Sequence, residues 1–238
     1  MNEQRPTLVL FDIDGTLLAS DSAGRAAFEL ALAELFHLSH AMDGISFAGS
    51  TDWRILEQVL LPAGYSPAEV AASVPAFAEA LARHLQAIIP RYRVRALPGS
   101  LALVEALAAD PRARLGLVTG NMALSVPIKL RAAGFDPAHF PVGAYGHEAV
   151  DRNALPPLAL SRARAYWGRD FPPERIVIVG DTANDVICAR SVRGRALAVL
   201  TGPASREEVA REKPYAILED LADRRAVEAI LFGEGGDG

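Results

Sequence analysis

The sequence predicts an α/β protein with a doubly wound parallel sheet and a second, smaller all-helical domain inserted into it. Strand and helix patterns alternate over residues 97–232, which is typical of a parallel sheet with helices on both faces. Helical patterns alone fill roughly seventy residues after Leu18, directly behind the first strand. We therefore expect a Rossmann-like core domain of residues 1–18 and 92–238, interrupted by a helical domain of residues 19–91.

Apolar residues at helical spacing predict the helices of the inserted domain. One face carries Phe28, Leu32, Leu35 and Phe36. A second carries Trp53, Leu56, Leu60 and Leu61. The alanine-rich residues 70–89 predict either one further helix or a pair broken at Pro75. The connections to the core, at residues 18–21 and 91–97, would act as hinges.

The core domain shows six further helical patterns between its strands. They cover residues 100–109, 122–133, 157–167, 183–191, 206–211 and 220–232. The glycine-rich end of the chain, residues 233–238, predicts a disordered tail.

Two acids stand at the end of the first predicted strand. The apolar run of residues 8–11 leads directly into Asp12, Ile13, Asp14, Gly15 and Thr16. Residues i and i+2 of a strand share a face, so Asp12 and Asp14 would address one small space. Two carboxylates at such a short distance repel each other unless a cation or a shared proton neutralises their charge. Mg²⁺ would suit this place, because it prefers oxygen ligands.

Polar groups also follow two later strands. Residues 175–179 end in Gly180 and Asp181, with Asp185 opening the helix that follows. Residues 115–118 end in Thr119, Gly120 and Asn121, just before another predicted helix. Ligands bind at the carboxyl ends of strands in open α/β sheets, and helix N-termini favour phosphate. These three strand ends therefore predict one site for a phosphorylated ligand.

The three motifs together resemble the haloacid dehalogenase superfamily, mainly its phosphatases, over nearly the whole chain. They read FDIDGTLL, LVTGN and VIVGDTANDV in chain order. The resemblance implies that Asp12 is a nucleophile that accepts the phosphoryl group and that Asp14 is the general acid and base. It further implies that Thr119 contacts the phosphoryl group.

The same resemblance implies the Mg²⁺ ligands. Asp181 would bind the ion with Asp12 and the main-chain carbonyl of Asp14, and Asp185 would hold it directly or through water. The substrate phosphate would lie against Gly15, Thr16, Gly120 and Asn121.

Asp14 distinguishes between the activities of this superfamily. A leaving alcohol needs a proton and the attacking water must lose one, and a single carboxyl can serve both steps. Halide leaves without a proton, so Asp14 argues against a haloacid dehalogenase. A phosphomutase similar to β-phosphoglucomutase, which uses the same acids, stays open as the alternative. A catalytically weak binding relative is a further alternative, against which the intact acids argue.

The cation that would neutralise the nucleophile and the phosphate has two candidates. Arg152 stands where the phosphoglycolate phosphatase pattern has a lysine, and arginine can contact phosphate through two nitrogens. Lys129 lies in the predicted helix after Asn121, where it would otherwise be a solvated residue. We favour Arg152.

The inserted domain resembles the small helical cap of this superfamily, which would cover the strand ends and contact the rest of the substrate. Ser50 and Thr51 lie in a stretch similar to a loop that faces the active site of phosphoglycolate phosphatase relatives. Either residue is equally suited to cap the helix that starts near Asp52. The expected substrate is a small phosphorylated metabolite, with phosphoglycolate as the leading candidate.

Composition indicates an ordinary soluble enzyme. The 238 residues carry a formal net charge of −5, which argues against nucleic acid or an anionic membrane as a partner. No apolar run has the length of a membrane span, and the first residues do not resemble a signal peptide. Cys188, the single cysteine, is expected to pack in a helix, and a cytoplasmic location fits this use. The chain would be a monomer or a homodimer.

Overall fold

A parallel sheet of six strands forms the centre of the protein. The computed structural model describes residues 6–233, and the strand order is β5-β4-β1-β6-β7-β8. The strands are β1 (Thr7–Phe11), β4 (Ala113–Thr119), β5 (Val142–Tyr145), β6 (Ile176–Gly180), β7 (Arg195–Val199) and β8 (Ala216–Leu218). Every neighbouring pair is parallel. The predicted doubly wound α/β fold is confirmed.

Side chains of the central strand, β1, pack on both faces of the sheet. Val9 and Phe11 point into one hydrophobic cluster, and Leu8 and Leu10 point into the other. This alternation follows from the two-residue period of a strand. Phe11 pairs with Leu117 of β4 and Val179 of β6, so the three strands end at the same level.

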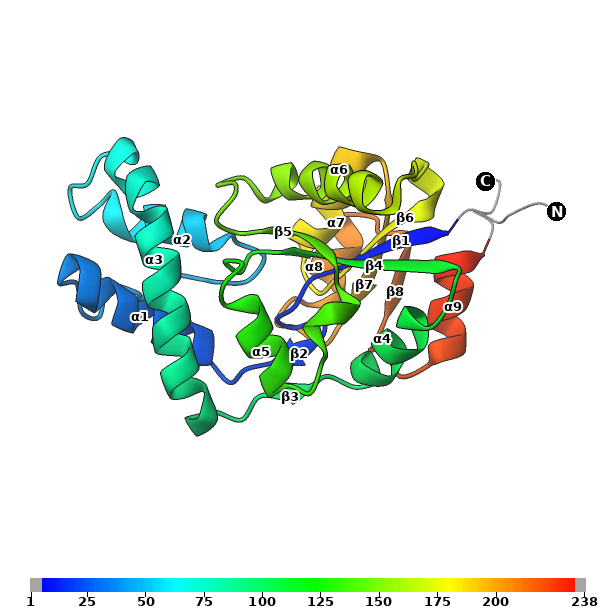
Figure 1. Ribbon diagram of the computed structural model, residues 1–238, viewed down its shortest axis with the longest axis horizontal. Coiled ribbons are helices and arrows are strands. Elements are labelled where there is room, and N and C mark those ends of the chain that lie inside the picture. Colours follow the sequence, from blue (N-terminus) through cyan, green and yellow to red (C-terminus); the bar gives the residue numbers. More distant parts are fainter. Residues whose placement is uncertain (1–5, 234–238) are drawn as a thin grey trace.

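Helices cover both faces of the sheet, as Figure 1 shows. They are α4 (Ser100–Ala108), α5 (Val126–Ala132), α6 (Leu155–Trp167), α7 (Ala183–Ala189), α8 (Arg206–Arg211) and α9 (Arg224–Phe232). Residues of α4, α5 and α9 fill one cluster, and residues of α6, α7 and α8 fill the other. Short 3-10 turns are η1 (Ile89–Arg91), η2 (Pro137–His139), η3 (Arg152–Ala154), η4 (Pro173–Arg175) and η5 (Arg190–Val192).

Two of these helices start later than the sequence predicts. The helix expected from residue 122 starts at Val126, because Met122 to Ser125 form a turn closed by a main-chain bond of 3.0 Å. The helix expected from residue 220 starts at Arg224, where the carboxylate of Asp223 accepts from the Ala226 amide at 3.1 Å. An aspartate at this position satisfies a free N–H of the first turn and thereby fixes the helix start.

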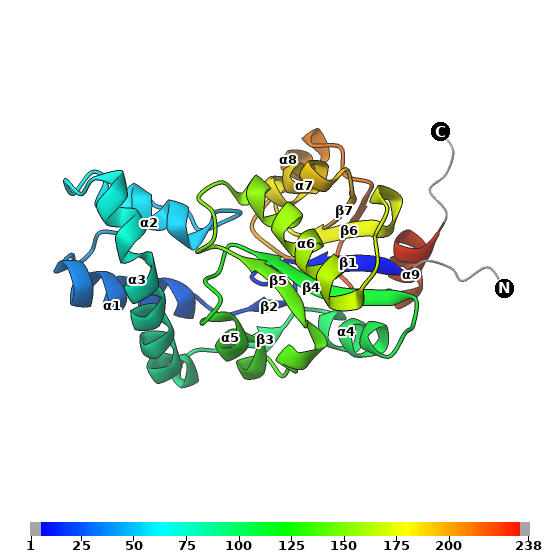
Figure 2. The same cartoon turned by 45° about the horizontal axis from the view of Figure 1, so that its top comes forward.

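Three helices form a group beside the carboxyl ends of the strands (Figures 1 and 2). They are α1 (Ala23–Phe36), α2 (Asp52–Leu60) and α3 (Pro67–Ile88). Their apolar side chains share a cluster that is separate from the two clusters of the sheet. Met122, which follows β4, is also buried in this cluster. The division into a core of residues 1–18 and 92–238 and a cap of residues 19–91 stays a prediction.

The alternative of two helices over residues 70–89 is wrong, because α3 continues through Pro75. Proline removes one helical hydrogen bond. Buried Phe77, Leu81 and Leu85 anchor the following turns to the cluster. Burial of such side chains contributes roughly 1.5–3 kcal/mol each, which is comparable to the cost of the proline. Leu35 and Leu61, expected on apolar faces, are exposed.

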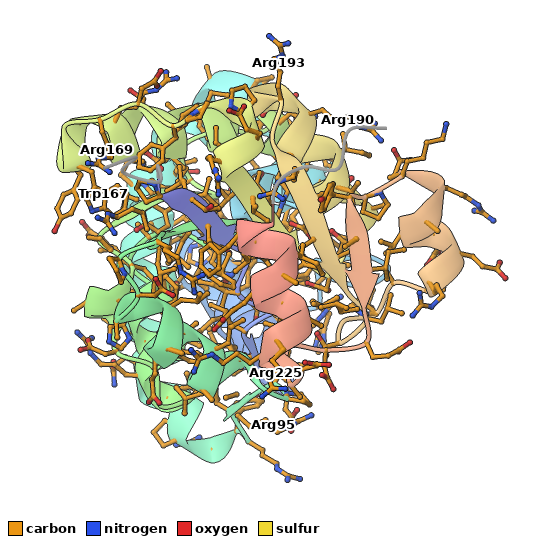
Figure 3. The ribbon with its side chains drawn as sticks, turned by 90° about the vertical axis from the view of Figure 1, so that its right-hand side faces the viewer. Arg95, Trp167, Arg169, Arg190, Arg193 and Arg225 are labelled. Atoms are coloured by element: carbon orange, nitrogen blue, oxygen red, sulfur yellow. The ribbon has the colours of Figure 1, made fainter. Side chains whose placement is uncertain are left out.

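Two short strands lie where the sequence predicts only hinges. Leu18–Ala19 (β2) pairs antiparallel with Arg95–Ala96 (β3), and the two connections between sheet and helical group thus run side by side. Arg95 forms an ion pair of 3.0 Å with Asp21, and Figure 3 shows Arg95 at the edge of the molecule. A ribbon of two residues per strand is too short to give a readable β pattern in the sequence.

Other expectations concern single features. Cys188 is buried in α7, and burial raises the pKa of its thiol to about 12, as expected for a packing residue. Within residues 6–233, none of the helices combines the length and the apolar character needed to cross a bilayer. The tail expected at residues 233–238 lies, apart from Gly233, outside the described residues.

Candidate active site

Asp12, Thr119 and Asp181 meet at one edge of the sheet. Asp12 directly follows β1, Thr119 ends β4, and Asp181 directly follows β6. Because β1 lies between β4 and β6 and the three strands end level, their polar residues share one space. Figure 1 shows that this edge faces the group of α1, α2 and α3.

Three buried carboxylates form the acidic centre of this edge. Oxygens of Asp12, Asp181 and Asp185 all lie within 4.8 Å of one another. Burial, with the other two acids, raises the pKa of Asp181 to about 8. Burial also raises the pKa of Asp12 to about 6, against the lowering effect of Arg152.

This acidic centre fits a hard divalent cation. Oδ1 of Asp12 is buried and has no hydrogen-bond partner in the part of the chain that the structure describes. An unpartnered oxygen within an all-carboxylate set suits Mg²⁺, which takes oxygen ligands and relieves the repulsion between the acids.

Two glycines leave room for the carboxylate of Asp181. A Cβ on Gly15 would lie 2.3 Å from Oδ2 of Asp181, and a Cβ on Gly202 would lie 1.7 Å from it. Gly15 also has a φ of +84°, which favours glycine. The hydroxyl of Thr16 donates to Oδ1 of Asp181 at 2.8 Å. In this structure Gly15 and Thr16 thus position the acid, and the contact with the phosphate that the resemblance implies for them stays a prediction.

Arg152 is buried between two of the acids. Its Nη2 lies 3.2 Å from Oδ2 of Asp12 and 2.5 Å from Oδ1 of Asp185. Burial lowers the pKa of the guanidinium, but Asp12 and Asp185 outweigh this and hold the pKa well above its ordinary value. Arg152 is therefore a permanent positive charge beside Asp12.

Lys129 is buried beside Asp14, so the alternative of a solvated helix residue is wrong. Its Nζ lies 2.6 Å from Oδ2 of Asp14 and 2.6 Å from Oδ1 of Asn121. Asn121 also donates to Asp14 at 2.8 Å, and Ser20 donates to it at 3.1 Å. Burial raises the pKa of Asp14, but Lys129 and these hydrogen bonds hold it below its ordinary value.

Thr119 and Gly120 lie between the core and the helical group. Thr119 is buried, and its hydroxyl accepts from the Asn121 side chain at 2.9 Å. A Cβ on Gly120 would lie 1.9 Å from the carbonyl oxygen of Ser50. Gly120 is therefore needed for the close approach of the segment that carries Ser50.

Thr51 is the N-cap of α2. Its hydroxyl accepts from the Arg54 amide at 3.1 Å and donates to the Val150 carbonyl at 3.0 Å. The capping role that the sequence allows for Ser50 or Thr51 thus belongs to Thr51. Ser50 lines the cavity described below.

Asp52 is a site residue that the sequence analysis missed. It is buried at the start of α2, and its Oδ2 accepts from the Met122 amide at 2.8 Å. Its own amide donates to the Gly120 carbonyl at 2.8 Å. Burial raises the pKa of this carboxyl to about 6. An acid in the first turn of a helix is ordinary, so its position in the chain does not indicate this inward contact.

A cavity of about 530 Å³ joins the acids to the helical group. Its polar end is lined by Asp12, Asp14, Lys129 and Arg152. Its other end is lined by apolar side chains of α1, α3 and the segment before α2. All the predicted acids except Asp185, and both candidate cations, border this one cavity.

Comparisons with known proteins place the chain in a family. Residues 9–190 match the model of the haloacid dehalogenase-like hydrolases. No functionally curated protein matches the sequence.

Several solved structures share the fold at low sequence identity. CbbY from Rhodobacter sphaeroides, solved with phosphate, is 22% identical at a TM-score of 0.67, over 92% of this chain and 96% of that one. A predicted phosphatase from Clostridium acetobutylicum is 16% identical at 0.67, over 94% and 99%. A predicted phosphoglycolate phosphatase from Haemophilus somnus is 22% identical at 0.62, over 95% and 99%.

Proposed function

Since the chain belongs to the haloacid dehalogenase-like hydrolases, we propose that it is a phosphoric monoester hydrolase that requires Mg²⁺. Its substrate would be a small phosphorylated metabolite. Its reaction would pass through a phosphoryl group carried by Asp12. Two of the structural relatives, both phosphatases by name, support the substrate class.

The single observation that carries the proposal is the different setting of the two acids after β1. Asp12 is paired with Arg152 at 3.2 Å, next to Asp181 and Asp185. Asp14 is paired with Lys129 at 2.6 Å, and its side chain is 39% exposed toward the cavity. One carboxylate thus lies in the charged centre, where a phosphoryl group would be held. The other lies where a leaving alcohol and a water molecule would exchange protons.

The reaction can be written with these residues alone. A carboxylate oxygen of Asp12 attacks phosphorus and the bond to the ester oxygen breaks. Asp14, which must be protonated at this step although Lys129 lowers its pKa in the free protein, gives that oxygen its proton. Asp14 then takes a proton from water, which attacks phosphorus, releases inorganic phosphate and restores the carboxylate of Asp12. Arg152 and Thr119 would hold the phosphoryl oxygens. A positive charge already in position can stabilise the charge that develops on them.

Mg²⁺ would be held by the side chains of Asp12, Asp181 and Asp185, with the main-chain carbonyl of Asp14. When bound, it supplies positive charge that lets the carboxylates and the phosphate approach one another. Lys129 would keep Asp14 in position through its ion pair and through Asn121.

We further propose that residues 19–91 act as a cap. Asn184 donates to the Gly49 carbonyl at 2.9 Å, and Trp53 donates to the Gly146 carbonyl at 3.0 Å. With the bonds of Thr51 and Asp52, these contacts hold the start of α2 on the loops that carry the candidate active site. A cap in this position would keep bulk water from the reacting groups.

Hydrolysis of p-nitrophenyl phosphate tests the proposal. We expect turnover with Mg²⁺, none with EDTA, and none for Asp12→Asn, with circular dichroism showing that the variant folds. A ³¹P spectrum with a sugar phosphate should show inorganic phosphate as the product. Metal-independent turnover that survives Asp12→Asn, or an isomerised sugar phosphate without free phosphate, would contradict the proposal.

A further inference from the structure

The cavity extends well beyond the groups that would handle a phosphate. Its volume of about 530 Å³ lies within the range of roughly 300–1,000 Å³ that pockets for drug-sized ligands have. Phosphoglycolate has about nine non-hydrogen atoms. At no more than roughly 30 Å³ for each, the share of a water molecule in the liquid, it would fill at most about half of this space.

The far end of the cavity is apolar. Its lining includes Phe28 of α1, Leu81 and Leu85 of α3, and Ile45 and Phe47 from the segment before α2. Phe28, Leu81 and Leu85 are buried in the core of the helical group. Phe47 packs edge to face against Phe28, with ring centroids 5.6 Å apart. Ile45 and Phe47 are only partly buried, so their apolar surface is available to a ligand.

Arg25 holds this apolar wall in place. Its Nη1 donates to the Met42 carbonyl at 2.8 Å, its Nη2 donates to the Ile45 carbonyl, and its guanidinium lies 5.2 Å from the centre of the Phe47 ring. Both terminal nitrogens therefore have main-chain partners. Fixed wall residues lose little freedom when a ligand binds, so their apolar surface contributes more to affinity.

The charges along the cavity do not favour a second anion. Lys129 is paired with Asp14, and Arg152 is paired with Asp12 and Asp185. Asp52 adds a further carboxylate to the wall. Among the residues that the structure describes, each cation lining this cavity thus has a carboxylate or carbonyl partner already. A carboxylate at the far end of a substrate would meet apolar side chains and Arg25, whose terminal nitrogens already donate to main-chain carbonyls.

We propose that this chain prefers phosphomonoesters whose alcohol part carries an aromatic or branched apolar group over esters of short anionic alcohols. The inference rests on the phosphatase activity proposed above and names the substrate class for it. The phosphate would lie beside Asp12 and Arg152, and the apolar group would lie against the partly exposed side chains of Ile45 and Phe47.

Matched alkyl esters test this preference on the unaltered enzyme. Ethyl phosphate and 2-phenylethyl phosphate release alcohols of similar acidity and differ by the ring, so a difference in kcat/KM reports binding of that ring. We expect kcat/KM to be at least about tenfold higher for the phenylethyl ester, as burial of a ring predicts. Phosphoglycolate, the third substrate, should be turned over less efficiently than the phenylethyl ester.

Substitutions in the apolar wall of the cavity test which residues cause the preference for the phenylethyl ester. Phe47→Ala should reduce the ratio of the two kcat/KM values toward one, and Ile45→Ala, which removes less surface, should reduce it in part. Leu61→Ala is the matched control, because Leu61 belongs to the same helical group but is exposed and away from the cavity lining. It should keep the full ratio.

Equal kcat/KM values for the two alkyl esters, with Asp12→Asn inactive on both, would overturn the preference and leave the phosphatase function intact. A preference for phosphoglycolate that Arg25→Met removes would also overturn it, because Arg25 would then bind an anion. Absence of metal-dependent turnover with every ester would overturn the proposed function and this inference with it.

Discussion

Nζ of Lys129 lies 2.6 Å from Oδ2 of Asp14, although the lysine comes from the middle of α5 and the acid follows β1. Arg152 contacts Asp12 instead, at 3.2 Å. Each of the two acids therefore has its own cation. This division of partners separates the contributions of the two basic residues, which the sequence leaves as competing candidates.

Arg152→Ala should reduce kcat more than Lys129→Ala does. Arg152 is the cation beside the proposed nucleophile, and loss of one charge-stabilising group typically lowers kcat by about 10²–10³. Lys129 acts through Asp14, so we expect a smaller loss, of about tenfold. Steady-state kinetics with one aryl phosphate at saturating Mg²⁺ measures both.

Removal of Arg152 also leaves two buried acids without their counter-charge, which costs about 3–5 kcal/mol. Arg152→Lys keeps the positive charge and serves as the control for folding. It should recover part of the lost turnover, although lysine cannot contact a phosphate through two nitrogens. Unchanged turnover in Arg152→Ala would refute the preference for Arg152.

Mg²⁺ should raise the melting temperature of this protein, and Asp181→Asn should abolish that response. Asp12, Asp181 and Asp185 are buried close together, so an ion that binds the folded state stabilises it by mass action. Asp181→Asn should also raise the melting temperature of the metal-free protein, because the neutral side chain removes repulsion among the three acids.

Thermal melts in EDTA and in about 10 mM Mg²⁺, with NaCl added to match ionic strength, would separate ion binding from screening. Equal shifts in wild type and in Asp181→Asn would show that the stabilising ion binds elsewhere.

The fold was largely predictable because its determinants are local. The strands are short apolar runs with β-favouring residues, and the acids Asp12, Asp181 and Asp185 directly follow or lie near their ends. The carboxyl ends of parallel strands lie at the same edge of the sheet, regardless of the sequence of the loops between them. The paired strands β2 and β3 were not predictable. Each has two residues, and Leu18 and Ala96 are brought together only by the surrounding tertiary structure.

The parts of the site that sequence reasoning missed depend on contacts between distant segments. The burial of Lys129 depends on Asp14, 115 residues earlier, and Asp52 is buried because it reaches the Met122 amide, 70 residues later. Each residue has an ordinary surface role at its own position in the chain. Docking of α2 on the loop after β4 gives Asp52 its inward partners, whereas Lys129 finds its partners in Asp14 after β1 and Asn121 after β4.

Gly120→Ala should lower kcat/KM by at least about tenfold, in line with the effect of small displacements of substrate-positioning groups. The added Cβ would lie 1.9 Å from the Ser50 carbonyl oxygen, so the start of α2 must move off the loop that carries Thr119. Hydrogen exchange of the Asp52 amide, which donates to Gly120, should become faster.

Gly168→Ala is the matched control for this substitution. Gly168 has a φ of +60° and open space at its Cβ, so alanine there costs about 1 kcal/mol of backbone strain and should leave turnover unchanged. If Gly120→Ala retained wild-type kcat/KM and exchange rates, the close approach of α2 would be unimportant for activity.

Asp52→Asn should raise the free energy of unfolding at pH 7.5 and change it little at pH 4. Burial raises the pKa of Asp52 in the folded protein to about 6, from 3.8 in the unfolded chain. The folded state thus binds the proton more tightly. The stability that this bound proton contributes is fully present below pH 3.8 and is lost as the pH rises through 6. The loss is at most about 3 kcal/mol for a shift of about two pKa units.

The asparagine side chain has no such titration, and its oxygen can still accept from the Met122 amide. Urea unfolding of wild type and variant at pH 4, 5, 6 and 7.5 measures the difference, with Asp43→Asn at an exposed position as the control. A difference that does not grow with pH would show that Asp52 is not the buried acid responsible.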